Sequence, residues 1–473
     1  MKGLAKHWIT NLVVLVLAIV MCRFLLGYWF GGTEDQCAHV RLWNAVQEHQ
    51  NLYAQTPRVQ VWPPLWWILV GLWGSLWRGF ATIAPGWVGA VGTTYALKLL
   101  YYTFEMALAF LLALHLARDG AQGLSTRSGD VLKYAGYFLL LPATWVLTSL
   151  HGNFDPIPAF FVIAAFLLLE FKTSETSALL AAFCVGLGAM ARTFPGIFIF
   201  PVLVFILRRH GWRTALFASV LAFVPTFVSL YPIYLMTPDA VAAAIGYRGT
   251  PGAWWGLAAV ARITISNSLG IAIFHGTYPV FYLAMLALLA GTVVGFWQRK
   301  VRIMNAGLLL AIGLFTFAPT LGNQNFYFLL PWAFWFAVKF QQRAAKFFLL
   351  FVSVNFVLAY IVLPIDLEHP VWFQWTYDCA GGHVARMASP KILVRFLVWF
   401  TAIFKLKELG YGHFIQLVMR VPVWGVMIWW FVSSLREVIA KWKGNQQLRQ
   451  RLRAPCVSSA GTRATNSQPV PPR

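Results

Sequence analysis

Residues 278–296 read YPVFYLAMLALLAGTVVGF and contain no charged side chain. A helix needs about 20 mainly apolar residues to cross the roughly 30 Å of hydrocarbon in a bilayer, and this run has that length. Residues 11–30 form a second such run, which is interrupted only by Arg23. Backbone polar groups in lipid must be satisfied within their own segment, which a helix achieves. Both runs therefore predict membrane-spanning helices.

The whole chain has the composition of an integral membrane protein. Of its 473 residues, 59% are hydrophobic and 11% are charged, and the mean hydropathy is +0.66. A soluble domain of this size could not bury that much apolar surface. The 23 Trp, 16 Tyr and 39 Phe residues suit the two interfaces of a membrane, and aromatic rings also stack on sugars. The composition thus predicts an all-α integral membrane protein.

Apolar runs divide the chain into about twelve predicted transmembrane helices. We expect them at residues 9–30, 92–117, 134–150, 156–171, 178–191, 194–207, 214–235, 278–297, 304–320, 326–340, 346–364 and 417–435. Two further apolar stretches, 62–83 and 391–404, are expected to be interfacial helices in the first and last large outer loops, although a fourteen-helix arrangement stays open. Residues 1–436 then form one membrane domain, and residues 437–473 form a basic cytoplasmic tail that we expect to be disordered.

The net charge of +22 is concentrated in the loops that the positive-inside rule assigns to the cytoplasm. Examples are the clusters Arg208-Arg209 and Arg299-Lys300 and the tail after Arg436. This distribution indicates orientation in the membrane and contact with anionic lipid headgroups. It does not indicate a nucleic-acid partner. Both termini are expected in the cytoplasm, and the chain is expected to be a multi-pass protein of the cell membrane, or of the endoplasmic reticulum membrane if it is eukaryotic.

An acidic pair, Glu34-Asp35, follows the first predicted helix on the outer side. A carboxylate at this level could accept the proton of a hydroxyl group that attacks a substrate held in the lipid. The alternative is that both residues simply belong to a solvated loop. Glu105, in contrast, falls in the middle of a predicted span, and Lys98 lies two helical turns before it. Because an unpaired charge in lipid is costly, we expect Glu105 to be protonated, paired with a buried polar partner or part of a pathway, and we favour a structural role.

Several short motifs occur in an order that resembles the GT-C superfamily of polytopic membrane glycosyltransferases. The segment from Gly32 to Trp43, followed by Trp62-Pro63-Pro64-Leu65, is similar to the opening of glucosyltransferases that extend a dolichol-linked oligosaccharide. The turn Ser149–Phe154 resembles their His-Gly-x-Phe element. Residues 186–195 and the segment Asn323–Tyr327 look more like bacterial polyprenol-phosphate-mannose-dependent transferases. The resemblance covers about residues 8–340 in motif order, and its individual motifs are weak.

The resemblance implies that a carboxylate after the first helix is the catalytic base. In the family the acidic residues are usually separated by one or two positions, whereas Glu34 and Asp35 are adjacent, so which of them acts stays open. Asp35 is our first choice and Glu34 our second. Arg192, Arg248, His151 and Asn323 are the candidate residues for binding the donor phosphate or sugar. A snorkelling side chain at a helix end is the alternative for Arg192 and Arg248, and an ordinary helix cap is the alternative for Asn323. Asp155 is expected to cap the helix that begins at residue 156.

These residues together predict an inverting transfer of a hexose, mannose or glucose, from a polyprenyl-phosphate carrier to a lipid-linked or glycan acceptor. No cofactor or resident metal is predicted, because the five Cys and ten His residues show no ligand spacing, although assistance by a divalent metal stays open. One alternative is a lipid-linked glycan flippase or another transporter. Another is an O-antigen ligase, for which His369, His383 and Arg386 in the last outer loop are candidates. The sequence identifies neither the sugar nor the acceptor.

Overall fold

A computed structural model describes residues 2–29, 34–48, 63–120, 128–150, 152–239, 241, 255–264, 267–298, 301–318, 323–357, 372–377, 384–387 and 420–440. Helices dominate these residues. They are α1 (Lys2–Trp29), α2 (Glu34–Gln47), α4 (Pro64–Ile83), α5 (Pro85–Gly120), α6 (Ser128–Leu139), α7 (Pro142–Thr144), the π-helix η1 (Trp145–Leu150), α8 (Pro156–Phe171), α9 (Glu175–Ala191), the 3-10 helix η2 (Phe194–Phe198), α10 (Ile199–His210), α11 (Trp212–Met236), α13 (Gly256–Thr264), α14 (Asn267–Trp297), α15 (Ile303–Phe317), the 3-10 helix η3 (Asn323–Leu329), α16 (Leu330–Lys339) and α17 (Arg343–Val357).

Two elements complete the described structure. An unlabelled helix, Arg420–Ala440, is the last described element of the chain. Between α17 and this helix, strands β1 (Trp372–Tyr377) and β2 (Val384–Met387) form an antiparallel hairpin, in which Trp372 is paired with Met387. Apart from this hairpin, the described elements are all helical, in agreement with the predicted all-α class. The expected interfacial helix at 391–404 and most of the tail from 437 onward lie outside the described residues.

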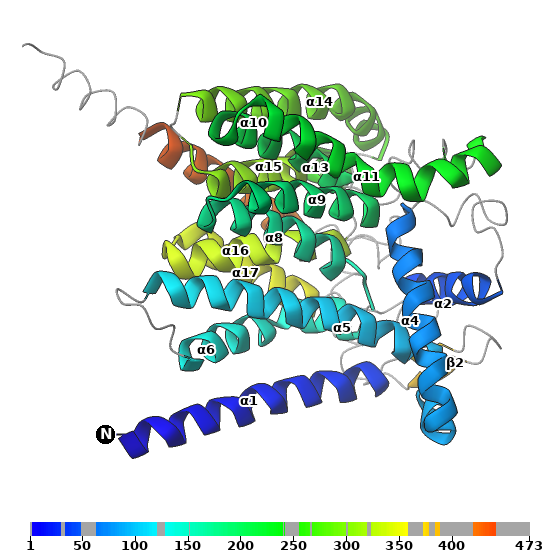
Figure 1. Cartoon of the computed structure of the whole chain (residues 1–473). Coiled ribbons are helices and arrows are strands. Elements are labelled where there is room, and N and C mark those ends of the chain that lie inside the picture. Colours follow the sequence, from blue (N-terminus) through cyan, green and yellow to red (C-terminus); the bar gives the residue numbers. More distant parts are fainter. Residues whose placement is uncertain are drawn as a thin grey trace, which may run out of the picture.

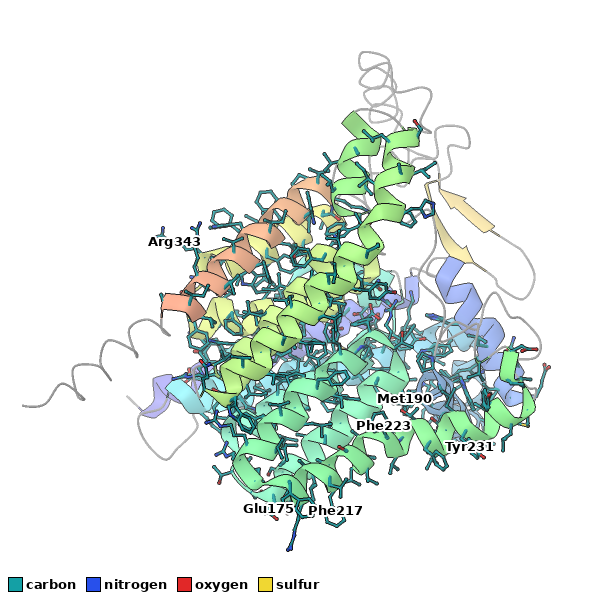
Figure 2. The ribbon with its side chains drawn as sticks, turned by 90° about the horizontal axis from the view of Figure 1, so that it is seen from above. Glu175, Met190, Phe217, Phe223, Tyr231 and Arg343 are labelled. Carbon is teal, nitrogen blue, oxygen red and sulfur yellow. The ribbon has the colours of Figure 1, made fainter. Side chains whose placement is uncertain are left out.

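Helix α8 lies at the centre of the molecule. It contacts α5, α9 and α15, and its buried side chains belong to the largest apolar cluster of the protein. Helices α11 and α14 lie at the periphery and expose many large apolar side chains. Phe217, Phe223 and Tyr231, which Figure 2 labels, are exposed along α11. Exposed apolar faces on long helices fit contact with lipid tails.

Four helices in the described part of the chain are long and apolar enough to cross a membrane. They are Tyr95–Arg118, Trp212–Met236, Ser268–Gly295 and Arg420–Ala440, and a bent pair, Gly129–Leu139 with Pro142–Ser149, would be a fifth. The twelve predicted spans are therefore not confirmed. Helices α8, α9 and α15 have 16, 17 and 15 residues. At about 1.5 Å per residue they extend roughly 22–26 Å, which is shorter than the hydrocarbon layer.

Prolines explain why two predicted helices are broken. The predicted helix at 134–150 bends by 61° between α6 and α7, where Pro142 begins the new helix. The predicted helix at 194–207 begins as the 3-10 turn η2, which contains Pro195, before it continues as α10. Sequence periodicity alone does not distinguish such a break from a continuous helix.

Helix α4 corresponds to the apolar stretch at 62–83 and is one continuous helix of 20 residues. It begins with Pro64 at its first turn, where the missing N–H costs nothing. Figure 1 shows α4 running across the direction of α1 and α5, beside α2 and at the end of the molecule opposite the N-terminus. Helix α4 is not among the helices that qualify as spans, and its position at the membrane surface stays a prediction.

Candidate functional site

The turn before α8 holds a buried carboxylate. Asp155 is fully buried, and its Oδ2 accepts a hydrogen bond of 2.9 Å from Asn153 Nδ2, while its Oδ1 pairs with Arg192. The prediction that Asp155 caps α8 is wrong, because its side chain makes no capping hydrogen bond. The reason lies in the next residues. Pro156 and Pro158 have no N–H, and the N–H of Ile157 already donates to Phe154 O, so the carboxylate is available to Arg192.

Arg192 is the C-terminal cap of α9 and has an extended backbone. Its guanidinium carbon lies 5.3 Å from the ring centroid of Phe154 and 5.6 Å from that of Phe194. The side chain is 15% exposed. A planar guanidinium held by rings and a carboxylate has a fixed orientation, which a snorkelling side chain lacks. The geometry therefore excludes the snorkelling alternative, and the phosphate-binding role of Arg192 stays a prediction.

His39 links α2 to this cluster. It is 2% exposed, and its Nδ1 lies 3.1 Å from the hydroxyl group of Tyr101 on α5. Its ring centroid lies 4.8 Å from that of Trp66 on α4 and 5.5 Å from that of Phe154. Phe154 therefore contacts Arg192 and His39 at once. These aromatic contacts join α2, α4 and α5 to the turn before α8, and Trp66, Tyr101 and Phe154 belong to a separate apolar cluster.

Glu34 and Asp35 are the first two residues of α2, not members of a loop as the sequence suggested. The positive end of a helix favours carboxylates at these positions. Position 35 lies one helical turn before His39 and so on the same face of α2. Nothing is described of the side chains of Glu34 and Asp35. The backbone thus places the acidic pair one helical turn from His39, which contacts Phe154, the ring that also contacts Arg192.

Lys98 is buried on α5, and its Nζ donates a hydrogen bond of 2.9 Å to Ser149 O. It belongs to the surroundings of the turn before α8. Glu105 is instead paired with Arg23 of α1, and it accepts a hydrogen bond of 3.1 Å from Tyr327. Of the three possibilities that the sequence left open for Glu105, the structure shows the paired one, with a partner that the sequence had not indicated.

The 3-10 helix η3 borders the same site. Asn323 is its first residue, and the ring of Phe328 lies 4.9 Å from that of Phe194, which in turn contacts Arg192. The side chain of Asn323 is outside the description. Asn325 has a buried Oδ1 that has no hydrogen-bond partner among the described atoms. A single aromatic contact, between Phe328 of η3 and Phe194, therefore connects η3 to the ring that packs against Arg192.

Two of the predicted binding residues, His151 and Arg248, lie in parts of the chain that the structure does not describe. The sequence did not indicate His39 as a contact residue, or Tyr101 and Lys98 as neighbours of the turn. The one available signal was that His39 lies within the motif from Gly32 to Trp43. Among the described residues, no group of three His, Cys, Asp or Glu side chains could hold a metal ion.

The site contains a cation of fixed orientation, Arg192, and the helix α2, which begins with two acidic residues. Phe154 connects them, because its ring contacts both Arg192 and His39 of α2. Arg192 has five N–H donors, more than a single carboxylate can accept, so the guanidinium can bind a second oxyanion beside Asp155. The phosphate of a lipid carrier is such an oxyanion. No protein-family model matches the chain, and no curated protein sequence matches it.

Proposed function

We propose that the chain is a membrane glycosyltransferase that takes a hexose from a polyprenyl-phosphate carrier. The acceptor is a lipid-linked or glycan hydroxyl group on the outer or lumenal face. The proposal puts the α2 end of the molecule on that face, opposite the N-terminus (Figure 1). The observation that carries it is the position of Phe154 between Arg192 and His39, because this contact couples the candidate phosphate site to the helix that begins with Glu34-Asp35.

The proposed reaction is a single inverting displacement. The acceptor oxygen forms a bond to C1 of the sugar while the bond from C1 to the phosphate oxygen breaks. Polyprenyl phosphate leaves with the electron pair of that bond, and the proton of the acceptor hydroxyl group passes to Asp35, or to Glu34. Arg192 stabilises the negative charge that develops on the leaving phosphate.

The second candidate function is transport of a lipid-linked glycan. Arg23 and Glu105 favour it, because charged residues within a membrane often mark a transport pathway. Their surroundings fit a structural pair better. Arg23 also donates to Thr144 O at 3.1 Å, and the cavity lined by Arg23 and Glu105 has a volume of about 10 Å³, which is no more than one water occupies.

The transferase proposal is tested with membranes that contain the full chain, labelled polyprenyl-phosphate mannose or glucose, and a mixture of lipid-linked acceptors. We expect transfer by the wild type and a loss of about 10²- to 10⁴-fold in Asp35→Asn or Glu34→Gln, which is the usual contribution of a general base. Glu48→Gln is the matched control, because Glu48 follows the opposite end of the same helix. Full activity in both acidic variants would refute the assignment of the base. Movement of intact lipid-linked glycan without transfer would favour transport.

A further inference from the structure

A second hollow lies far from the candidate site, between α14, α15 and the helix Arg420–Ala440. Its volume is about 320 Å³, within the range of sites for small ligands. Apolar residues such as Leu288, Leu309 and Val438 form most of its lining. Two of the apolar side chains that line it, Val294 and Ile439, are also exposed. A hollow with such a lining on a membrane protein suits a hydrocarbon chain.

Small residues of α14 create the hollow. Gly291 and Gly295 form the pattern GxxxG, which usually lets two membrane helices approach closely. Gly295 instead makes room for the turn that follows α14, because a Cβ atom there would lie 2.5 Å from Val301 Cγ2. A Cβ atom at Gly291 would meet nothing within 4 Å. Gly291 therefore faces open space instead of another helix.

The end of the hollow is rich in positive charge. Val301 and Leu435 line it, and the residues that follow them, Arg302 and Arg436, are both exposed. Neither arginine forms an ion pair within the described part of the chain. Basic residues at the end of an apolar groove between membrane helices complement an anionic lipid headgroup.

A basic turn between α16 and α17 lies at the same end. Gln342 Nε2 donates hydrogen bonds to Ser434 Oγ at 3.2 Å and to Glu437 Oε1 at 3.3 Å, so this turn contacts the last part of the helix Arg420–Ala440. Figure 2 shows Arg343, the first residue after Gln342, beside that helix. Glu437 is the acidic residue here, and it is engaged by Gln342. Positive charge thus prevails around the end of the hollow.

We propose that the hollow holds an acyl chain of an anionic phospholipid, whose phosphate is bound by Arg302 and Arg436. The apolar lining selects a hydrocarbon chain, and the two arginines select a negative headgroup over a zwitterionic one. The site is independent of the proposed glycosyl transfer. It lies at the end of α14 and α15 where the basic loops gather, whereas the candidate active site lies beside α2 and α4.

The experiment is native mass spectrometry of the full chain with added phosphatidylglycerol or phosphatidylcholine that have identical acyl chains. We expect the wild type to retain one phosphatidylglycerol molecule more tightly than phosphatidylcholine. Gly291→Leu fills the hollow and should lose retention of both lipids, and Gly291→Ala should be intermediate. Gly276→Leu is the matched control. Gly276 lies on the same helix, and a Cβ atom there also meets nothing within 4 Å, but Gly276 does not line the hollow.

The headgroup contact is tested with the double variant Arg302→Gln/Arg436→Gln. Each arginine near an anionic headgroup contributes about fivefold in affinity, so retention of phosphatidylglycerol should fall roughly 25-fold. Phosphatidylcholine, whose phosphate is balanced by its own choline cation, should lose less, so the preference for phosphatidylglycerol should fall. Equal retention of the two lipids by the wild type would overturn the proposal, as would unchanged retention in Gly291→Leu. A wild-type dimer that Gly291→Leu converts to a monomer would instead assign the GxxxG face to a second copy of the chain. Size-exclusion profiles identify variants that fail to fold, for which the Gly291→Ala result decides.

Discussion

Arg192, the residue that ends α9, forms an ion pair with Asp155, the residue that precedes α8. Helices α8 and α9 are adjacent in the sequence and pack closely against each other. The pair closes the far end of this antiparallel helix pair, next to α2. The orientation of the candidate phosphate-binding guanidinium therefore depends on the start of the central helix of the fold.

The Arg192–Asp155 pair is expected to be important for stability. Removal of one partner of a buried pair costs about 3–5 kcal/mol, and exposure of part of Arg192 places the expected loss at the lower end of that range. Thermal unfolding of the detergent-solubilised chain should show a clear loss in Asp155→Asn and in Arg192→Gln. The double variant should lose much less than the sum of the two, because the charges are removed together. Strict additivity would show that the two residues do not interact.

Arg23 and Glu105 should behave as a structural pair. Arg23→Leu leaves the carboxyl group of Glu105 buried without its partner and should lower the thermal unfolding temperature strongly. Arg23→Leu/Glu105→Leu replaces the pair by apolar side chains and should recover most of the loss. Glycosyl transfer, normalised to folded protein, should be the same in the double variant as in the wild type. A folded double variant without any transfer would assign the pair a functional role.

Gly186 should tolerate no side chain. A Cβ atom there would lie 2.2 Å from Ala222 O, which is a backbone atom of α11 and cannot move aside alone. Gly186→Ala should therefore force α9 and α11 apart and cost at least the 1–3 kcal/mol typical of overpacking. Gly425→Ala is the control, since a Cβ atom at Gly425 meets nothing within 4 Å. Similar yields and unfolding temperatures of the two variants would contradict the close contact between α9 and α11.

Tyr101 should act through His39 as a positioning residue for α2. Tyr101→Phe removes only the hydroxyl group that lies 3.1 Å from His39 Nδ1. We expect transfer at saturating donor to fall by about fivefold to tenfold, corresponding to the 1–1.5 kcal/mol of a lost hydrogen bond, with little change in the KM for the donor. Trp73→Phe is the matched control. Trp73 of α4 donates a hydrogen bond to Ala96 O on α5, the helix that carries Tyr101, without touching His39. An equal loss in the two variants would indicate general damage to the packing of α4 and α5.

The sequence predicted most helices but not how they meet. The expected helix 156–171 agrees with α8 in both bounds, because Pro156 begins it and the polar residues after Phe171 end it. The partner of Glu105 could not be found, since Arg23 lies on another helix and the periodicity of α5 points only to Lys98. The contact of Phe154 with Arg192 and His39 is likewise a tertiary contact among three separate segments. Local patterns carry no information on such contacts, whereas the acidic start of α2 was visible as Glu34-Asp35.

The most direct test of the proposed mechanism asks on which side of the membrane α2 begins. Cys37 lies in the first turn of α2, and Cys456 lies in the basic tail, so the chain provides its own pair of reporters. Each is retained alone in a background without other cysteines, the chain is produced in bacterial cells, whose single inner membrane exposes the outer face to the reagent, and intact cells are treated with a maleimide that does not cross this membrane. We expect Cys37 to be labelled without permeabilisation of the inner membrane and Cys456 only after it. Labelling of Cys37 only after permeabilisation would place Glu34 and Asp35 in the cytoplasm, away from the proposed donor, and would contradict the proposed mechanism.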